Sequence, residues 1–326
     1  MQIIKKTFWL SVPFLTLTNN IEKSNYIKYP LEEAQYKNMN KMITSDKIDP
    51  AYHTDTVTSK DGTIINYQIT GSGAGIIIVP GALSVAANYN ALASELGKSF
   101  TVYTIERRGR GLSGAQGENY SIAKECEDVL AIQKKTQASY LFGHSYGGLI
   151  ALEIAKTNKV FAKIALYEPG VSVDKSISMV WTPAYEKYLA EKKYADAFTV
   201  FSIGCGPEKA QKTPHWLMKL MLPLFIKKEE RDLMYSLLAQ NLNEHKEVAH
   251  LDNTYKNYQQ VSADVLFMYG GKSGLKWISK ATKVLTEVVP SIKVKEFPKL
   301  NHFAPDKNAP HEIAKAINDF LYSVDN

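Results

Sequence analysis

Three side chains that could share a proton-transfer reaction lie far apart in this chain of 326 residues: Ser145, Glu168 and His302. A serine hydroxyl is a weak nucleophile, and it needs a nearby base, commonly a histidine, to accept its proton. A carboxylate then orients the histidine and stabilises its charged form. These residue types therefore indicate nucleophilic catalysis by a serine.

Ser145 is the centre of a G-x-S-x-G pentapeptide, Gly143 to Gly147. The apolar run SYLFG leads into it and the helical segment GGLIALEIAK leaves it, which is the strand-turn-helix context of a nucleophile elbow. A serine on so sharp a turn has strained backbone angles, and side chains two residues before and after it would collide across the bend. The glycines are therefore expected there, and Gly148 is expected to let the helix pack closely on the sheet.

His302 is the expected base among the 7 histidines of the chain. It lies in KVKEFPKLNHFAP, in a loop between a predicted C-terminal strand and the last predicted helix. Loops at the carboxyl ends of parallel strands meet at one edge of a sheet, where the elbow also stands. His144 adjoins Ser145, and because neighbours on a tight turn point apart, it is expected to pack or to line a pocket.

Two backbone N–H groups are needed to hold the negative charge that develops on an attacked carbonyl oxygen. The first is expected from Tyr146, the residue after the nucleophile, and the second from the loop after the strand GIIIVPG. We assign the second donor to Ala82, with Leu83 as the adjacent alternative.

Short apolar runs separated by turn residues begin near His53. A hairpin is predicted with its turn at Asp61-Gly62. After it, strand and helix signals alternate, which predicts an α/β fold with a doubly wound, mostly parallel sheet. The alternation stops after Pro169 and resumes with the strand DVLFMYG. The expected parts are a leader or linker at 1–50, an α/β core at 51–170 and 261–326, and a helical cap inserted at 171–260.

The order strand-PGALS, strand-ERRGRGLSG, strand-GHSYGG and NHF resembles the α/β-hydrolase fold family from about Asp55 to the C-terminus. Many members begin the first of these loops with His-Gly, whereas this chain has Pro80-Gly81. GRGLSG matches the dinucleotide pattern G-x-G-x-x-G, but a loop follows it where that motif requires a helix, so no nucleotide site is expected. The stretch instead resembles the family's D-x-R-G-x-G-x-S loop, with Glu106 where Asp is frequent.

The resemblance leaves the acid of the triad in question. In most of the family the acid follows the strand that resumes after the cap, and Ser273 stands at that place here. No Asp or Glu occurs between positions 270 and 278. Some members, including a subset of haloalkane dehalogenases, carry the acid at the end of the preceding strand, where this chain has Glu168. We therefore expect Glu168 to serve His302, although a strand-end carboxylate facing solvent or in a salt bridge would give the same sequence.

The resemblance implies a serine hydrolase of the carboxylesterase type that needs no cofactor or metal and acts on a small-molecule substrate. Bulky apolar residues of the insertion favour an apolar substrate, although they would also serve to pack the cap: Trp181, Phe198, Phe201, Trp216, Met218, Met221 and Phe225. Lactone hydrolysis, carbon–carbon bond hydrolysis and cofactor-free perhydrolysis use the same groups. A ligand-binding relative with little turnover would explain the empty acid position.

Composition limits the partners, disulfides, metal sites and location that can be expected. The net charge of +6 comes from scattered lysines, not from one basic stripe, so no nucleic-acid partner is indicated. Cys126 and Cys205 are too few for a disulfide framework and lack zinc-site spacing. Residues 1–20 have the charged start and apolar run of a signal peptide without a cleavage site. A cytoplasmic location is expected, with export or membrane attachment through residues 1–20 as the alternative, and the oligomeric state stays open.

Overall fold

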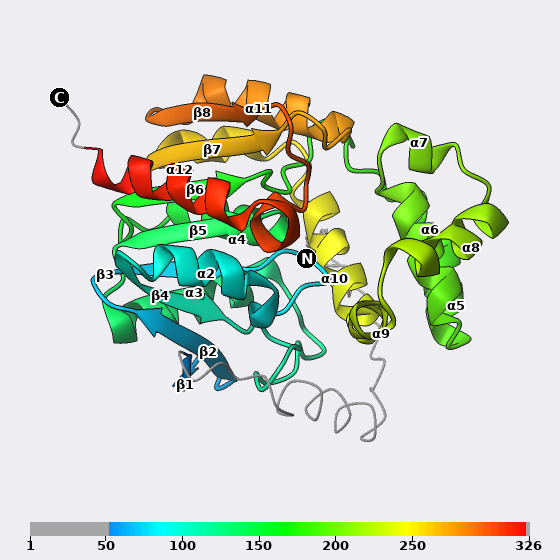
Figure 1. The fold of residues 1–326 in the computed structure, drawn as a ribbon, viewed down its shortest axis with the longest axis horizontal. Helices are drawn as coiled ribbons and strands as arrows, with labels where there is room; N and C mark the ends of the chain where they lie inside the picture. The colour runs from blue at the N-terminus through cyan, green and yellow to red at the C-terminus, as the bar shows by residue number, and fades with distance from the viewer. Residues whose placement is uncertain (1–51, 324–326) are drawn as a thin grey trace, which may run out of the picture.

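The computed structural model describes residues 52–323, which form an eight-stranded sheet with helices on both faces (Figure 1). The strands lie in the order β1-β2-β4-β3-β5-β6-β7-β8. Their bounds are β1 His53–Thr58, β2 Ile64–Gly71, β3 Ala74–Val79, β4 Phe100–Ile105, β5 Tyr140–His144, β6 Lys163–Tyr167, β7 Asp264–Gly270 and β8 Ile292–Phe297. The pairs β1–β2 and β2–β4 are antiparallel and all others are parallel. The predicted doubly wound, mostly parallel sheet is confirmed.

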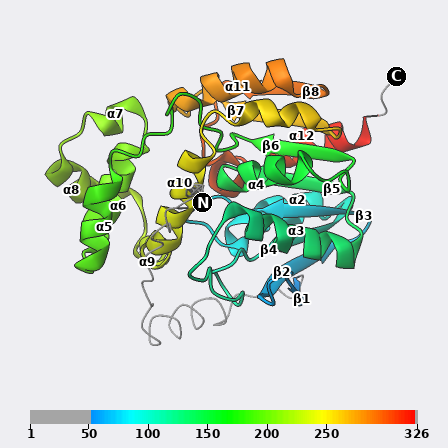
Figure 2. The same ribbon diagram turned by 180° about the vertical axis from the view of Figure 1, so that it is seen from behind.

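Helices cover the two faces in separate groups (Figures 1 and 2). One face carries α2 (Asn90–Leu96) and α12 (Pro310–Tyr322), and the other carries α3 (Ile122–Thr136), α4 (Tyr146–Ala155) and α11 (Lys276–Val288). The central strands are therefore buried on both sides, which explains the continuous apolar run of β3. The crossover from β3 to β4 contains a 3₁₀ turn, η1 (Ala86–Tyr89), and α2, neither of which the sequence analysis predicted.

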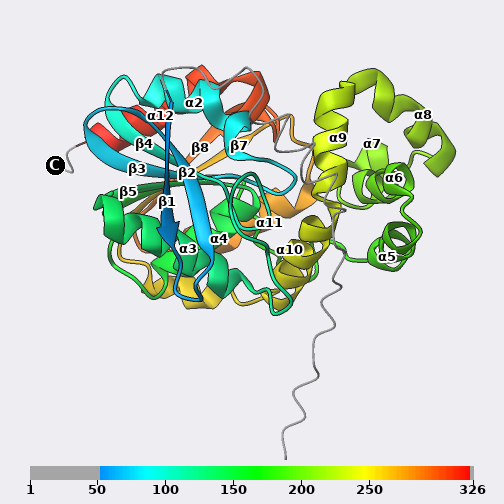
Figure 3. The ribbon, with the colours of Figure 1, turned by 90° about the horizontal axis from the view of Figure 1, so that it is seen from below.

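A block of helices lies between β6 and β7. Its bounds are α5 Thr182–Ala190, α6 Tyr194–Gly204, α7 Glu208–Gln211, α8 His215–Phe225, α9 Lys228–Ser236 and α10 Leu238–His250. The helices α5 and α6 are separated by a short turn in which Lys192 adopts a left-handed conformation with φ 55°. Figure 3 shows α10 between the sheet domain and the outer helices.

Two further short helical segments lie in the C-terminal part of the chain. The 3₁₀ helix η2 (Tyr255–Gln260) packs on α4 and α11, and the π-helical turn η3 (Ala304–Asn308) leads from the His302 loop into α12. The exact limits of the expected cap, 171–260, stay a prediction. The expected leader or linker at 1–50 lies outside the described residues, as does attachment through residues 1–20.

Within residues 52–323, no helix is long and apolar enough to cross a bilayer. Cys126 and Cys205 are both free and half-buried. The expected cytoplasmic location stays a prediction.

Candidate active site

Ser145 lies on a strained turn between β5 and α4, with φ 55° and ψ −118°. The flanking glycines are required by close backbone contacts. A Cβ on Gly143 would lie 2.5 Å from the carbonyl oxygen of Gly147, and a Cβ on Gly147 would lie 2.1 Å from that of Val79. Both distances are far inside van der Waals contact. The predicted collision across the bend is confirmed for Gly143, whereas Gly147 is required by the end of β3.

The backbone around the serine is held by the neighbouring strand. Ser145 N–H donates to the carbonyl oxygen of Tyr167 at 3.0 Å, and Gly170 N–H donates to that of Ser145 at 2.9 Å. A Cβ on Gly148 would lie 2.8 Å from Cβ of Pro169, so glycine lets the helix pack against the end of β6. Unfavourable backbone angles persist where surrounding structure over-determines them, and these contacts do so here.

Glu168 follows β6 directly and is fully buried, with φ 44°. Its Oε2 lies 2.6 Å from Nδ1 of His302. Its Oε1 accepts hydrogen bonds from Gly270 N–H at 2.8 Å and from Ser273 Oγ at 2.5 Å. Hydrogen bonds to a carboxylate are stronger than those to a neutral acceptor. The structure thus brings the expected acid and the expected base into direct contact.

The contact with Glu168 fixes which ring nitrogen of His302 is available. A carboxylate only accepts, so Nδ1 of His302 donates, and Nε2 of the neutral ring is left as an acceptor. Within residues 52–323, Ser145 Oγ forms no hydrogen bond with His302. Such bonds are often long before substrate binds. The loop of His302 nevertheless contacts the elbow, because the His302 ring lies 4.9 Å, centroid to centroid, from the ring of His144, the residue before Ser145.

The loop after β3, residues 80–85, is the second wall of the site. Its Gly81 approaches the elbow so closely that an added Cβ would lie 3.2 Å from Cβ of Ser145. Gly81 N–H donates to Oη of Tyr89 at 3.0 Å. In the described part of the chain, the N–H groups of Ala82 and Tyr146 donate to no protein acceptor, and neither does that of Leu83. Free N–H groups beside a serine could donate hydrogen bonds to a developing oxyanion.

His144 joins two loops of the site, a role that the sequence analysis missed. Its Nε2 lies 2.9 Å from the carbonyl oxygen of His302 and therefore donates to it. Burial, together with the nearby His302, lowers the pKa of His144 well below its ordinary value. The ring is thus neutral, and its Nδ1 accepts from Oη of Tyr89 at 2.7 Å. Since Tyr89 also accepts from Gly81 N–H, one relay links the β3 loop to the His302 loop.

Most of the bulky residues that suggested an apolar pocket are either buried in packing or exposed to solvent. Trp181, Phe198 and Met218 are buried, and Trp181 and Phe198 belong to a core shared by the inserted helices and the β3 loop. Trp216 and Phe225 of α8 face solvent, with 68% and 76% of their surface exposed. Packing and surface exposure therefore account for these five.

Two aromatic residues that the sequence analysis did not select lie beside the expected base. The ring centroids of Trp277 and Phe303 are 6.2 and 5.7 Å from that of His302. Phe303 is adjacent to His302 in sequence and could have been noticed, whereas Trp277 reaches the site only because α11 begins after the β7 loop.

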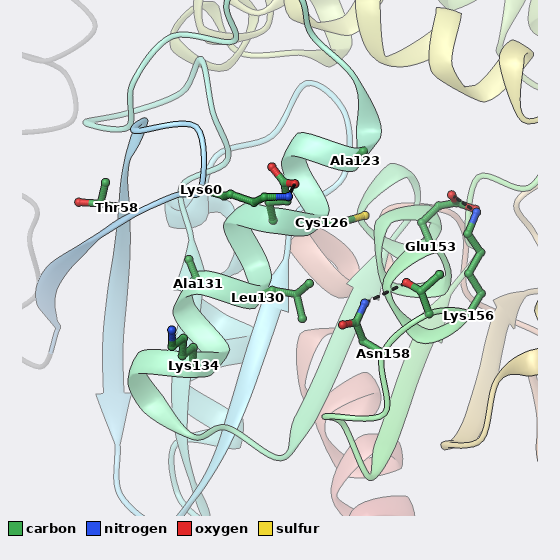
Figure 4. Close-up of a pocket in the computed structure, with 12 residues that line it drawn as sticks. Thr58, Lys60, Ala123, Cys126, Leu130, Ala131, Lys134, Glu153, Lys156 and Asn158 are labelled. Carbon is green, nitrogen blue, oxygen red and sulfur yellow. Dashed lines mark hydrogen bonds and ion pairs between the residues drawn. The ribbon is translucent and has the colours of Figure 1, made fainter.

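A surface groove of about 720 Å³ lies away from these residues (Figure 4). Cys126 and Leu130 of α3 line it together with Glu153 and Lys156. Glu153 and Lys156 form an ion pair at the C-terminal end of α4, the opposite end from Ser145. Burial raises the pKa of the Cys126 thiol well above its ordinary value, which makes it a poor nucleophile. None of these four residues therefore gives the groove a reactive nucleophile.

Known proteins resemble this chain in sequence and in fold. Residues 72–305, more than half of the chain, match the family model described as "Serine aminopeptidase, S33", a hydrolase family. The chain is a member of the α/β-hydrolase family. A solved structure of an α/β hydrolase from Sphaerobacter thermophilus DSM 20745 is similar, with a TM-score of 0.70 and 27% identity, covering 82% of this chain and 100% of that one. The resemblance found in the sequence is thus confirmed.

Two curated relatives match shorter parts of this α/β hydrolase. An uncharacterized hydrolase, YraK, of Bacillus subtilis (strain 168) is 33% identical over 97 residues, which is 28% of this chain and 36% of that protein. N-formylmaleamate deformylase of Pseudomonas putida is 31% identical over 106 residues, 31% of this chain and 40% of that protein. The matches thus span two fifths or less of these relatives. What these comparisons establish is membership of a family of hydrolases.

Proposed function

We propose that this α/β hydrolase cleaves carboxylic esters of small apolar substrates through a triad of Ser145, His302 and Glu168. The observation that carries the proposal is the 2.6 Å contact between Nδ1 of His302 and the buried carboxylate of Glu168. That contact leaves Nε2 of His302 available as the base for Ser145, which lies on a strained turn.

In the proposed acylation step, Nε2 of His302 takes the proton from Ser145 Oγ as the oxygen attacks the ester carbonyl. The imidazolium that forms is stabilised by Glu168, whose own position is held by Ser273 and Gly270. The negative oxygen of the tetrahedral intermediate is held by the N–H groups of Ala82 and Tyr146. When the intermediate collapses, the imidazolium protonates the leaving alkoxide, and the acyl group stays on Ser145.

In the deacylation step, His302 takes a proton from water, which attacks the acyl-serine carbonyl. The same two N–H groups hold the second oxyanion. Collapse returns the proton from His302 to Ser145 Oγ and releases the carboxylic acid, so the enzyme ends in its starting state.

An apolar substrate is supported by the aromatic residues next to His302 rather than by the inserted helices. Trp277 is half-buried and Phe303 is 46% exposed, so both could contact an acyl or alkyl group. Water exclusion by such a group also strengthens the electrostatic interactions of the triad.

A second candidate is hydrolysis of an amide or formamide bond, which the similarity to N-formylmaleamate deformylase favours. Lactone, carbon–carbon and peracid chemistry use the same groups. The sequence feature that favoured a ligand-binding relative was Ser273 at the usual acid position. The contact of Glu168 with His302 supports turnover instead.

The test is hydrolysis of p-nitrophenyl esters of increasing acyl length by the wild type and by Ser145→Ala, with N-formyl amides assayed in parallel. We expect ester turnover by the wild type, loss of it in Ser145→Ala, and labelling of Ser145 by a fluorophosphonate probe. Faster turnover of the formyl amides would select the second candidate. A folded wild type that hydrolyses neither class and is not labelled would refute a working serine hydrolase.

A further inference from the structure

A buried arginine holds the β3 loop from behind. The guanidinium of Arg107, which is fully buried, donates to both carboxylate oxygens of Glu125, at 2.9 and 2.6 Å. Its Nη1 donates to the carbonyl oxygens of Gly81 at 3.1 Å and of Pro80 at 3.4 Å. The carbonyl of Gly81 and the N–H of Ala82 belong to one trans peptide and point in opposite directions. Arg107 therefore orients the Ala82 N–H.

The same arginine contacts the residue that carries the other free N–H group. The guanidinium carbon of Arg107 lies 4.8 Å from the ring centroid of Tyr146, a cation–π geometry. The hydroxyl oxygens of Tyr146 and Tyr120 lie 2.8 Å apart. The Tyr120 hydroxyl donates a hydrogen bond to Oε1 of Glu125, also at 2.8 Å. Burial alone would raise the pKa of Glu125, but Arg107 outweighs burial and lowers it below its ordinary value. One charged cluster thus supports both proposed oxyanion donors.

The inserted helices complete this cluster through Glu244 of α10, a fully buried carboxylate. Its Oε1 lies 2.5 Å from Nη2 of Arg110 and 3.1 Å from Nη2 of Arg107. Arg110 in turn donates through Nε to the carbonyl oxygen of Ser84 in the β3 loop, at 2.9 Å. Glu244 therefore forms ion pairs with both arginines that donate hydrogen bonds to carbonyl oxygens of this loop.

Apolar packing joins the same two elements. Leu83 and Val85 of the β3 loop are buried in one cluster with Leu238 and Leu242 of α10. The position of α10 and the conformation of the β3 loop are thus coupled by side-chain packing as well as by charge.

The charges of the cluster balance only when α10 is in place. Arg107 and Arg110 carry two positive charges, and Glu125 and Glu244 carry two negative ones. Without Glu244, Arg110 would lose its ion-pair partner among residues 52–323, and Arg107 would keep only Glu125. Removing one partner of a buried ion pair is strongly unfavourable because the other charge is left uncompensated. The arginines would then shift toward other acceptors, and the peptides that they hold would move with them.

We infer that Glu244 is a positioning residue through which the inserted helix α10 sets the geometry of the oxyanion hole. This inference rests on the proposed function and extends it, because it makes catalysis depend on the position of α10 relative to the β3 loop. A substrate or partner that displaces α10 would lower turnover without touching Ser145, His302 or Glu168.

The experiment compares Glu244→Gln with Glu247→Gln. Glu247 is a matched control, since it lies on the same helix, is also buried, and accepts a hydrogen bond from Ile122 N–H at 2.8 Å, away from the β3 loop. Three quantities are measured on the full chain: kcat and KM for p-nitrophenyl acetate, the melting temperature, and amide hydrogen exchange of residues 80–89.

Glu244→Gln is expected to lower kcat roughly 10- to 100-fold, with KM within about threefold of the wild type, because misplaced oxyanion donors weaken transition-state binding. It should also speed hydrogen exchange in residues 80–89. Glu247→Gln should lower the melting temperature to a similar extent and leave both kcat and that exchange unchanged. If Glu244→Gln does not fold, Glu244→Asp keeps the charge, and a smaller loss of kcat is expected.

Unchanged kcat and exchange in Glu244→Gln would overturn the inference, and so would equal losses in both variants, which would indicate general loosening. If the wild type hydrolyses no ester and resists the fluorophosphonate probe, the proposed function fails. Hydrogen exchange still decides the coupling in that case, since faster exchange only in Glu244→Gln supports it and equal exchange refutes it.

Discussion

Ser273 Oγ lies 2.5 Å from one carboxylate oxygen of Glu168, and Nδ1 of His302 lies 2.6 Å from the other. Ser273 follows β7, where most α/β hydrolases carry the acid, whereas Glu168 follows β6. The two strand ends are adjacent because β6 and β7 pair in parallel. A carboxylate at either end can therefore reach the same histidine, and here the β7 loop supplies a hydroxyl donor instead of the charge.

This relationship predicts that the acid can be moved between the two strand ends. Glu168→Ala should lower kcat by about 10³- to 10⁴-fold, as expected when the histidine loses its carboxylate. The double variant Glu168→Ala/Ser273→Asp should recover at least tenfold of that loss. Ser273→Asp alone should also lower kcat, because two carboxylates in contact cannot both be ionised without cost. Steady-state ester hydrolysis measures all three, and a double variant no better than Glu168→Ala would contradict the prediction.

The contacts around the elbow predict a large difference in stability between the variants Gly147→Ala and Gly170→Ala. In Gly147→Ala the new methyl group would lie 2.1 Å from the carbonyl oxygen of Val79. The strand or helix must then shift, at a cost of about 3 kcal/mol or more, at the upper end of overpacking effects. In Gly170→Ala the nearest atom, the carbonyl oxygen of Ser145, would lie at an ordinary 3.6 Å. Urea unfolding should show a large loss of stability in the first variant and less than 1 kcal/mol in the second, and similar losses in both would count against this account.

Glu106 predicts a pH-dependent loss of stability. Burial raises its pKa to about 7, and its Oε2 has no partner within residues 52–323. Between its ordinary pKa of 4.5 and about 7, the folded protein holds a proton that the unfolded chain releases, so this group destabilises the fold increasingly as pH rises. Glu106→Gln stays neutral, and it should raise the melting temperature more at pH 8 than at pH 5. Equal shifts at both pH values would show that Glu106 does not titrate in this way.

His144 predicts the opposite pH dependence. Its pKa in the folded protein is well below its ordinary value of 6.5, so below about pH 6.5 the unfolded chain binds a proton that the folded protein does not. This contribution to stability is present above pH 6.5 and is lost as the pH falls. In His144→Gln the side-chain amide can still donate to the carbonyl oxygen of His302 but does not titrate. Its melting temperature should therefore fall less than that of the wild type between pH 7 and pH 5, and parallel curves would exclude the effect.

The sequence by itself determined the elements whose causes are local. The elbow could be predicted because Gly143 is needed by contacts within one turn, whereas the contact that requires Gly147 is with Val79 of β3. The sheet could be predicted because apolar runs and helical periodicity alternate along the chain. Chain order and loop position were enough to select Ser145 and His302. Glu168 could be proposed because position 273 lacked a carboxylate, but the sequence could not show which group its carboxylate contacts.

Only the tertiary structure decided the contacts between distant segments. Glu168 and His302 are 134 residues apart, as are Arg110 and Glu244, and no periodicity or motif specifies such pairs. Each pair forms because burial forces a charged group to find a partner, and the partner is whichever group the packed elements bring within reach. The breaks between the inserted helices and the bridging role of His144 have the same origin, since both depend on which surfaces the folded chain buries together.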